Sequence, residues 1–169
     1  MTATEDAYRF EFTSIDGDRL PFDAWRGRPV LVVNTASYCG YTPQYSDLEA
    51  LWQRYRSRGL VVLGVPSNDF GRQEPDSEAE IKEFCATNYA IGFPLTRKYP
   101  VLGAAAHPFY RWIAETLGEA GTPRWNFHKY LIAPGGEHGG DLVGAWPAQV
   151  APTDRRIIAE IDRLLPPEA

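Results

Sequence analysis

The sequence predicts an α/β fold in which helices cover both faces of a central mixed sheet, with a β-hairpin at the N-terminus. Two continuous apolar runs rich in β-branched residues, 29–36 and 60–66, are typical of strands buried on both faces. Each run is followed by a segment with the apolar periodicity of a helix. The chain then continues with a hairpin and a final helix, an order that implies a mixed sheet between two helical layers.

The size and composition of the chain indicate one domain over residues 1–169. Domains usually contain about 100–200 residues, and no repeat, low-complexity tract or linker divides this sequence. Hydrophobic residues make up 44% of the chain and charged residues 23%. These fractions are ordinary for a globular domain and exclude intrinsically disordered, collagen-like and coiled-coil proteins.

The charge pattern argues against a nucleic-acid partner. The chain has 17 basic and 22 acidic side chains, a net charge of −5, whereas nucleic-acid-binding domains tend to be basic on one face. The tightest basic group, Arg54, Arg56 and Arg58, alternates along a predicted helix and is interpreted as a solvated face. The N-terminal segment lacks the basic and apolar regions of a signal peptide, and the longest apolar runs are too short to span a bilayer. We therefore expect a cytoplasmic protein with reduced thiols and no stable membrane insertion.

The first half of the chain carries clear turn and helix-start signals. Asp16-Gly17 predicts the turn of the N-terminal hairpin, because this dipeptide tolerates the positive φ of tight turns. Thr42 suits the N-cap of the next helix, and Pro43 suits its first position, where the missing N–H costs nothing. This helix is expected to extend to about Arg58.

The second half completes the arrangement. Ser77 and Glu80 form a capping-box pattern that begins a helix ending near Tyr89. The remaining predicted elements are a short strand near 92–95, a helix over 108–117, a strand over 127–133, a glycine-rich turn from 134–136, a strand over 142–146 and a helix over 153–165. This order of elements is a thioredoxin-like arrangement with additions.

The two cysteines, Cys39 and Cys85, are the first place to look for chemistry, since two cysteines cannot form the disulfide scaffold of a secreted protein. Cys39 lies between a buried strand and a helix start, where unpaired N–H groups and the helix dipole stabilise an anion. The thiolate is the nucleophilic form of cysteine. A lone cysteine is otherwise a small buried hydrophobe, but this context favours a reactive thiol. Thr42 stands where a CxxC pair would have its second cysteine, which excludes CxxC disulfide exchange.

Three segments, NTASYCGYTPQY, VPSNDFGRQEP and WNFHKYLI, resemble the signature regions of the glutathione peroxidase family, and the resemblance covers roughly residues 8–146. It implies a thioredoxin fold and a thiol peroxidase that reduces hydrogen peroxide and organic hydroperoxides. In that family a peroxidatic cysteine or selenocysteine is surrounded by glutamine, tryptophan and asparagine. These roles carry over to Cys39, Gln73, Trp125 and Asn126, and the cysteine at position 39 resembles a member without selenium.

The residue types around the predicted nucleophile suit the reaction. When a thiolate attacks one peroxide oxygen, negative charge builds on the departing oxygen. The amides of Gln73 and Asn126 and the indole N–H of Trp125 are neutral donors that can stabilise this charge. Removing one such positioned donor typically costs about 10²–10³-fold in rate. Cys39 becomes a sulfenic acid in this reaction and needs a second thiol to recycle it.

Cys85 is the candidate for that second thiol. It falls on or beside the apolar face of the helix that begins near Ser77, and the periodicity by itself indicates a buried structural cysteine. The segment EFCATNYAIGFP, however, resembles the region that carries the resolving cysteine in thioredoxin-dependent members. The resemblance implies a Cys39–Cys85 disulfide made with local unfolding of the helix, since the Cα atoms must come within about 7 Å.

The short connection from Leu117 to Trp125 resembles the monomeric branch of the family that is reduced by thioredoxin. Thioredoxin is therefore the expected reductant and a monomer the expected state. Two alternatives stay open: a peroxide sensor or redox relay protein of the same fold, and a one-cysteine peroxidase that depends on glutathione. No lid insertion is visible, so Cys39 is expected to be exposed and the preferred peroxide stays open as well.

Two departures from the family pattern concern Asp69, where the family usually has glutamine, and Ser67, where it often has cysteine. A carboxylate beside Cys39 would disfavour the thiolate, so Asp69 is expected to face solvent. The C-terminal stretch LVGAWPAQVAPTD also departs from the family's basic and aromatic pattern. No cofactor or metal is expected, because the three histidines, His107, His128 and His138, are too few and too widely spaced for a metal site.

Overall fold

The computed structural model describes residues 6–135 and 139–166 and confirms the predicted α/β fold. Its central sheet has four strands in the order β4-β3-β5-β6. These strands are β3 (Val30–Thr35), β4 (Val61–Pro66), β5 (Lys129–Ile132) and β6 (Leu142–Trp146). β3 and β4 run parallel, whereas β5 runs antiparallel to both β3 and β6. The sheet is therefore mixed, as predicted.

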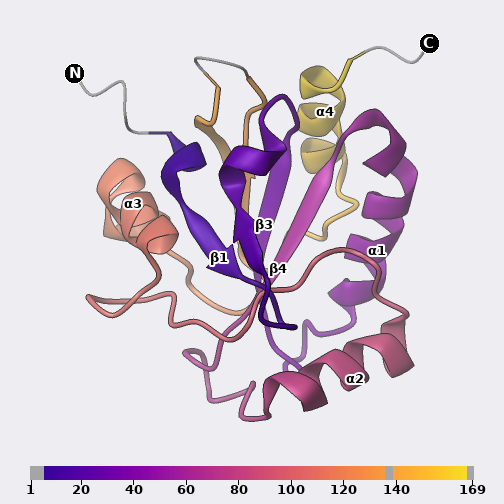
Figure 1. Cartoon of the computed structure of the whole chain (residues 1–169), viewed down its shortest axis with the longest axis vertical. Helices are drawn as coiled ribbons and strands as arrows, with labels where there is room; N and C mark the ends of the chain where they lie inside the picture. Colours follow the sequence, from indigo (N-terminus) through magenta and orange to yellow (C-terminus); the bar gives the residue numbers. More distant parts are fainter. Residues whose placement is uncertain (1–5, 136–138, 167–169) are drawn as a thin grey trace.

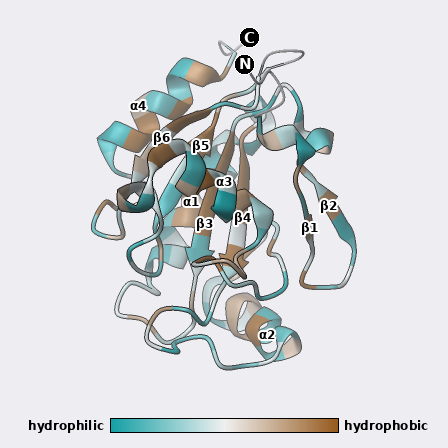
Figure 2. Ribbon diagram, turned by 90° about the vertical axis from the view of Figure 1, so that its left-hand side faces the viewer, coloured by the Kyte–Doolittle hydropathy of each residue, from teal (hydrophilic) through white to brown (hydrophobic). Residues whose placement is uncertain are grey.

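The N-terminal hairpin forms a sheet of its own and stands to one side of the central strands (Figure 2). Its strands β1 (Glu11–Thr13) and β2 (Arg19–Pro21) pair antiparallel. The turn between them passes through Gly17, whose φ of 93° lies in the region that favours glycine. The Ser14 hydroxyl oxygen accepts hydrogen bonds from two backbone N–H groups of this turn. The Asp-Gly signal therefore marks the turn correctly.

Helices cover both faces of the sheet (Figure 1). The four helices are α1 (Gln44–Tyr55), α2 (Glu78–Tyr89), α3 (Pro108–Leu117) and α4 (Arg155–Leu164). α1 and α4 pack on one face, α3 and the hairpin pack on the other, and α2 lies at one end of the sheet. Within the described residues, none of these helices has the length and apolar character needed to cross a membrane.

The protein has two hydrophobic cores, one on each face of the central sheet. β3 contributes side chains to both, which explains its continuous apolar sequence. Leu31 and Val33 pack with α1 and α4, whereas Val30 and Val32 pack with α3 and the hairpin. All six residues of the strand are buried. Full burial of a side chain of this size stabilises a fold by about 1.5–3 kcal/mol, so the strand is a main source of stability for both layers.

The structure corrects two predicted elements. The strand expected near 92–95 is reduced to isolated bridges that pair Leu95 with Gly64 and Thr96 with Ser14. Pro94 has no N–H to donate to a longer ladder, and only its carbonyl oxygen joins the pairing, by accepting from Gly64. The long helix expected to reach Arg58 ends as an α-helix at Tyr55 and closes with one 3₁₀ turn. The glycine-rich turn from 134–136 and His138 fall partly or wholly outside the described residues.

His107 ties the start of α3 to the hairpin. Its ring Nδ1 accepts the backbone N–H of Phe109, at 3.0 Å, and therefore caps the helix. Its Nε2 donates to the carbonyl oxygen of Glu11, at 2.8 Å, and the ring stacks on Phe12 with centroids 3.8 Å apart. This arrangement needs the neutral imidazole, and burial lowers the pKa of His107 to about 4.

We predict that His107 makes the stability of the protein depend on acid pH. Its pKa of about 4 lies below the value of about 6.5 in an unfolded chain, so this stability is complete above pH 6.5 and is lost as the pH falls toward 4. In His107→Asn, whose amide can still cap α3, the decrease in unfolding free energy over this range should be smaller by about 2 kcal/mol. Urea unfolding at a series of pH values measures it. Parallel pH curves for the two proteins would contradict the prediction, since His128 titrates in both.

Candidate active site

Cys39 lies in the loop that joins β3 to α1. Its sulfur accepts a hydrogen bond from the backbone N–H of Tyr41, at 3.3 Å, and an amide N–H directed at sulfur stabilises negative charge there. The expectation that Cys39 is exposed is wrong. Only 8% of the residue is accessible, because the loop folds against the α1 face of the core. The thiol is therefore held at the edge of the core beside a helix start.

Thr42 fixes the geometry of this loop. Its hydroxyl oxygen accepts the backbone N–H of Cys39, at 2.9 Å, and the hydroxyl donates to the carbonyl oxygen of Ala36, at 2.8 Å. The prediction that Thr42 is the N-cap of α1 is wrong, since Pro43 occupies that position without a side-chain cap. Tight turns, in which each N–H bonds the carbonyl three residues earlier, run from Cys39 into α1 and leave the Thr42 side chain to close the loop.

Gln73 connects the Cys39 loop to the segment that carries Asn126. The backbone N–H of Tyr38 donates to the carbonyl oxygen of Gln73, at 3.0 Å. The side-chain NH₂ of Asn126 donates to Oε1 of Gln73, at 2.9 Å. Because Oε1 is used as an acceptor, the NH₂ group of Gln73 is the part of this amide that can donate to a bound ligand. The structure thus brings two of the predicted site residues into direct contact.

Trp125 lies between the two cores. It is half-buried, and its ring centroid lies 5.7 Å from that of Phe70. Gly71 packs against its edge, since a Cβ atom at this position would come within 3.1 Å of the indole. Gly71 also has a φ of 64°, so a side chain here would be both strained and crowded. The tight turn before Gln73 therefore sets the position of the indole.

Asn34, which the sequence did not single out, holds the Trp125 segment. Its side-chain NH₂ donates to the carbonyl oxygen of Trp125, at 3.0 Å, and its own carbonyl accepts the N–H of Phe127, at 2.6 Å. Phe127 has a φ of 66°, which is uncommon for a bulky residue and costs about 1–3 kcal/mol. A polar residue inside the buried apolar run of β3 is the signal that could have identified Asn34.

Cys85 lies on the buried face of α2, as its periodicity predicts, and only 1% of it is accessible. Burial raises the pKa of this thiol to about 11; the neighbouring Tyr45 hydroxyl lowers it, and the charge of Glu74 raises it further. Both cysteines are free thiols in this structure. At neutral pH, Cys85 is therefore a protonated thiol for as long as α2 stays closed.

The helix that carries Cys85 is weakly anchored. Its start is the predicted capping box, in which Ser77 and Glu80 exchange hydrogen bonds. Within α2, however, only Ile81 and Cys85 are buried. The residue that caps the C-terminal end of α2 is Ala90, whose φ of 49° would be better tolerated by glycine. Few buried contacts and a strained end are features of segments that open locally.

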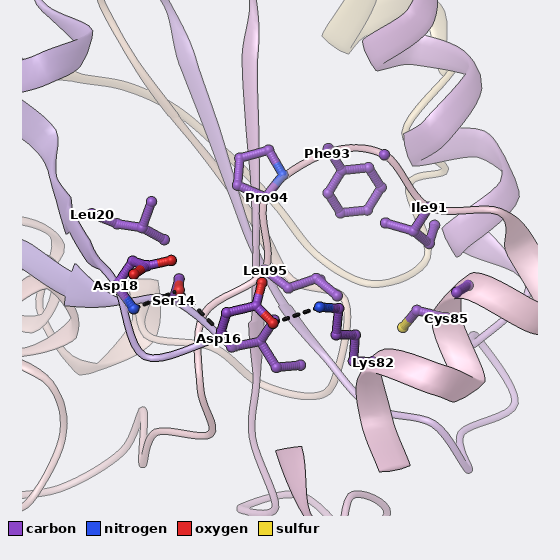
Figure 3. Close-up of a pocket in the computed structure, with 13 residues that line it drawn as sticks. Ser14, Asp16, Asp18, Leu20, Lys82, Cys85, Ile91, Phe93, Pro94 and Leu95 are labelled. Atoms are coloured by element: carbon purple, nitrogen blue, oxygen red, sulfur yellow. Dashed lines mark hydrogen bonds and ion pairs between the residues drawn. The ribbon is translucent and has the colours of Figure 1, made fainter. Parts of the chain in front are cut away.

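A pocket of about 350 Å³ lies next to Cys85, between α2, the hairpin turn and residues 91–95 (Figure 3). The sulfur of Cys85 points to the pocket side of the helix. An ion pair between Asp16 and Lys82, at 2.6 Å, links the hairpin to α2 beside the pocket. Both side chains are more than half exposed, so this pair adds little stability. The pocket and the exposed ion pair show that α2 is not closely packed against the hairpin.

The departures from the family pattern lie at defined positions. Asp69 is exposed, as expected, and its carboxylate accepts the N–H groups of Val101 and Leu102, at 2.7 and 3.2 Å. The part of the divergent C-terminal stretch that follows β6 is held by the buried Lys129. Its ammonium donates to the carbonyl oxygens of Ala148 and Val150, and burial lowers its pKa to about 7.

The sequence profile of glutathione peroxidases matches residues 7–114, more than half of the chain and a range that contains Cys39, Gln73 and Cys85. The chain belongs to the glutathione peroxidase family. It is therefore a peroxidase, and the resemblance to this family is confirmed; the first two of the three motifs lie within the matched residues.

Similar proteins and structures agree with this assignment. The glutathione peroxidase-like peroxiredoxin gpx1 of Schizosaccharomyces pombe is 48% identical over 119 residues, 69% of this chain and 75% of the relative. The hydroperoxy fatty acid reductase gpx1 of Synechocystis is 39% identical over 171 residues, 96% of this chain and 98% of the relative. The crystal structure of T. cruzi GPX1 is 28% identical, with a TM-score of 0.71 over 94% of this chain and 95% of that chain. A thioredoxin-family interchange protein from Chlorobium tepidum, at 17% identity and a TM-score of 0.67 over 94% of each chain, shares the fold alone.

For this peroxidase we predict that Ser77→Ala exposes Cys85 more often. Loss of an N-cap costs about 1 kcal/mol, which corresponds to about fivefold more frequent opening of α2. In a Cys39→Ser background, the alkylation rate of Cys85 should rise by this factor, as followed by mass spectrometry. Ser57→Ala, at an exposed position outside α2, is the control. Equal alkylation rates in Cys39→Ser alone, with Ser77→Ala and with Ser57→Ala would show that reagents reach Cys85 through the pocket, without opening of α2.

Proposed function

We propose that this peroxidase reduces hydroperoxides with Cys39 as the nucleophile, Gln73, Trp125 and Asn126 as hydrogen-bond donors, and Cys85 as the resolving thiol. The observation that carries the proposal is the geometry of the Cys39 loop. An amide N–H is directed at the Cys39 sulfur, and Tyr38, the residue before it, is hydrogen-bonded to Gln73, the partner of Asn126. These contacts link the Cys39 loop to two of the proposed donors, Gln73 and Asn126.

The first step oxidises Cys39. The thiolate attacks one oxygen of the peroxide, so that an S–O bond forms as the O–O bond breaks. The sulfur gives up two electrons and becomes a sulfenic acid. The departing alkoxide takes up a proton and leaves as an alcohol, or as water when the substrate is hydrogen peroxide. Donors that are already in place stabilise the charge on this oxygen without reorganisation.

The second step uses Cys85. Its thiol attacks the sulfenic sulfur of Cys39, a disulfide forms, and the hydroxyl leaves with the thiol proton as water. Because Cys85 is buried and protonated in the closed helix, α2 has to open before this attack. The weak anchoring of α2 supports such an opening.

Thioredoxin is the proposed reductant, with its dithiol regenerating both cysteines by thiol–disulfide exchange. The support is the presence of a second cysteine, the short connection between α3 and Trp125, and relatives named peroxiredoxins. Since recycling by thioredoxin requires a reducing compartment, we place the protein in the cytoplasm. Because this short connection resembles the monomeric branch of the family, we also propose that the protein is a monomer.

Fatty acid hydroperoxides are proposed among its substrates. One relative that aligns with 96% of the chain is named a hydroperoxy fatty acid reductase. Beside Cys39, the side chain of Tyr38 is 56% exposed, and Trp125 is half-buried. The Tyr38 ring, on the residue before Cys39, and the Trp125 ring, which packs against the same core as Cys39, offer apolar contact to an acyl chain.

A peroxidase assay that varies the electron donor tests this function. With thioredoxin, its reductase and NADPH, the wild type should turn over continuously and faster than with glutathione. Cys39→Ser should abolish peroxide consumption, because no other residue is proposed to attack the peroxide. Cys85→Ser should consume one equivalent of peroxide and then stop when thioredoxin is the donor.

The outcomes separate the alternatives. Faster turnover with glutathione, retained in Cys85→Ser, would establish a one-cysteine peroxidase. A single oxidation event of the wild type without turnover would establish a sensor or relay protein. Non-reducing mass spectrometry that finds only hyperoxidised or intermolecular Cys39 would remove Cys85 from the cycle.

The donor role of Gln73 is tested separately. Gln73→Ala should lower the second-order rate constant of Cys39 oxidation by about 10²–10³-fold, because one positioned donor is lost. Stopped-flow tryptophan fluorescence after mixing with peroxide measures this step alone. Gln53→Ala is a matched control on the exposed side of α1. A decrease below threefold in Gln73→Ala would argue against the donor role.

A further inference from the structure

Glu74 is a buried carboxyl group to which the proposed reaction gives no part. It follows Gln73 directly, and none of its surface is accessible. Its backbone N–H donates to the side-chain oxygen of Asn68, at 2.9 Å. Neither carboxylate oxygen has a hydrogen bond of normal geometry with any described residue. A buried carboxylate without such partners is costly, whereas a protonated carboxyl is tolerated far better.

This carboxyl group lies where the two cysteine-bearing segments meet. Ser37, two residues before Cys39, contacts it from the loop after β3. Its charge also acts on Tyr45 of α1 and on Cys85 of α2. The buried oxygens of Ser37 and Tyr45 make no hydrogen bond of normal geometry within the described residues either. Glu74 therefore sits in a buried polar cluster with Ser37, Tyr45 and Cys85.

The electrostatic surroundings of Glu74 place its titration near neutral pH. Burial has the largest effect and raises the pKa of Glu74 to about 7. The hydroxyl and the backbone N–H of Ser37 lower this pKa, as does the charge of Lys98, whereas the charge of Asp76 raises it. The other titratable groups that its charge reaches are Tyr38, Tyr45 and Cys85.

We propose that Glu74 is a positioning residue that couples loss of its proton to the release of Cys85 from α2. The proposal rests on the proposed resolving role of Cys85. The neutral carboxyl group is compatible with the closed cluster, whereas the charged form is better stabilised when α2 moves away and water reaches it. Ionisation of Glu74 therefore favours the open helix, in which Cys85 can attack the oxidised Cys39.

The direction of the pH effect follows from linkage. The pKa of Glu74 is about 7 in the closed state and returns toward about 4.5 when water reaches it, so the closed state binds more protons. The population of open α2 should rise about tenfold from pH 6 to pH 8 and level off above it. Cys85 itself contributes at higher pH, because its pKa in the closed helix is about 11. Lys129 titrates near pH 7 but lies outside the cluster.

Hydrogen exchange on the reduced protein tests the proposal without peroxide. Protection factors of the amides over residues 83–89, corrected for intrinsic exchange, should fall about tenfold from pH 6 to pH 8 in the wild type. In Glu74→Gln they should be independent of pH over this range. Glu83→Gln, an exposed change of the same kind on α2, should behave as the wild type. A pH dependence that persists in Glu74→Gln would overturn the proposal.

A second variant covers the case in which Glu74→Gln does not fold. Ser37→Ala removes the hydroxyl that favours the charged form of Glu74. The fall in protection should then continue to higher pH before it levels off, and an unchanged levelling-off pH would overturn the proposal. The rate of Cys39–Cys85 disulfide formation after a peroxide pulse provides the functional readout, and its rise with pH should extend to higher pH in Ser37→Ala. If no disulfide forms while the exchange data behave as expected, the role of Cys85 fails and the coupling through Glu74 stands.

Discussion

The hydrogen bonds of Asn34 hold the parts of this site in register. This residue lies near the carboxyl end of β3, fully buried between the two cores. Its side chain and its backbone carbonyl bind the residues on either side of Asn126. If the Asn34 side chain were lost, the carbonyl oxygen of Trp125 would lose this hydrogen bond. The same two bonds hold the unfavourable backbone of Phe127, and this fixes Trp125 and Asn126 relative to the strand that leads to Cys39.

The two thiols differ in the backbone groups around them and in how strongly burial disfavours their charged form. Cys39 lies at the start of a run of turns, and one N–H of this run, that of Tyr41, is directed at its sulfur. Cys85 lies on the buried face of a complete helix, where charge is disfavoured. A peroxidatic thiol needs the first environment at all times. A resolving thiol is best kept in the second until it is needed, which requires a helix that opens at low cost.

Several elements could be predicted from local sequence alone. The bounds of α3 and β6 agree with their predictions, and the capping box of Ser77 and Glu80 is present. In these segments the periodicity and the end signals point to one structure. Thr42 shows where such reasoning fails, since a threonine before a proline is a good N-cap by propensity. Here a closer partner, the amide of Cys39, takes its hydroxyl group. Propensity ranks the local options of a side chain but does not account for partners across a loop.

The sequence by itself determined the fold class, the family and the identities of the two cysteines, because apolar periodicity and contiguous motifs are local properties of a chain. Only the tertiary structure decided that Cys39 is nearly buried, that Gln73 pairs with Asn126 across 53 residues, that Asn34 holds the Trp125 segment and that Glu74 is a buried carboxyl group. Burial and pairing depend on which segments meet at the ends of β3 and β4. No local pattern encodes this, because the free energy of a buried polar group depends on partners that are distant in the sequence.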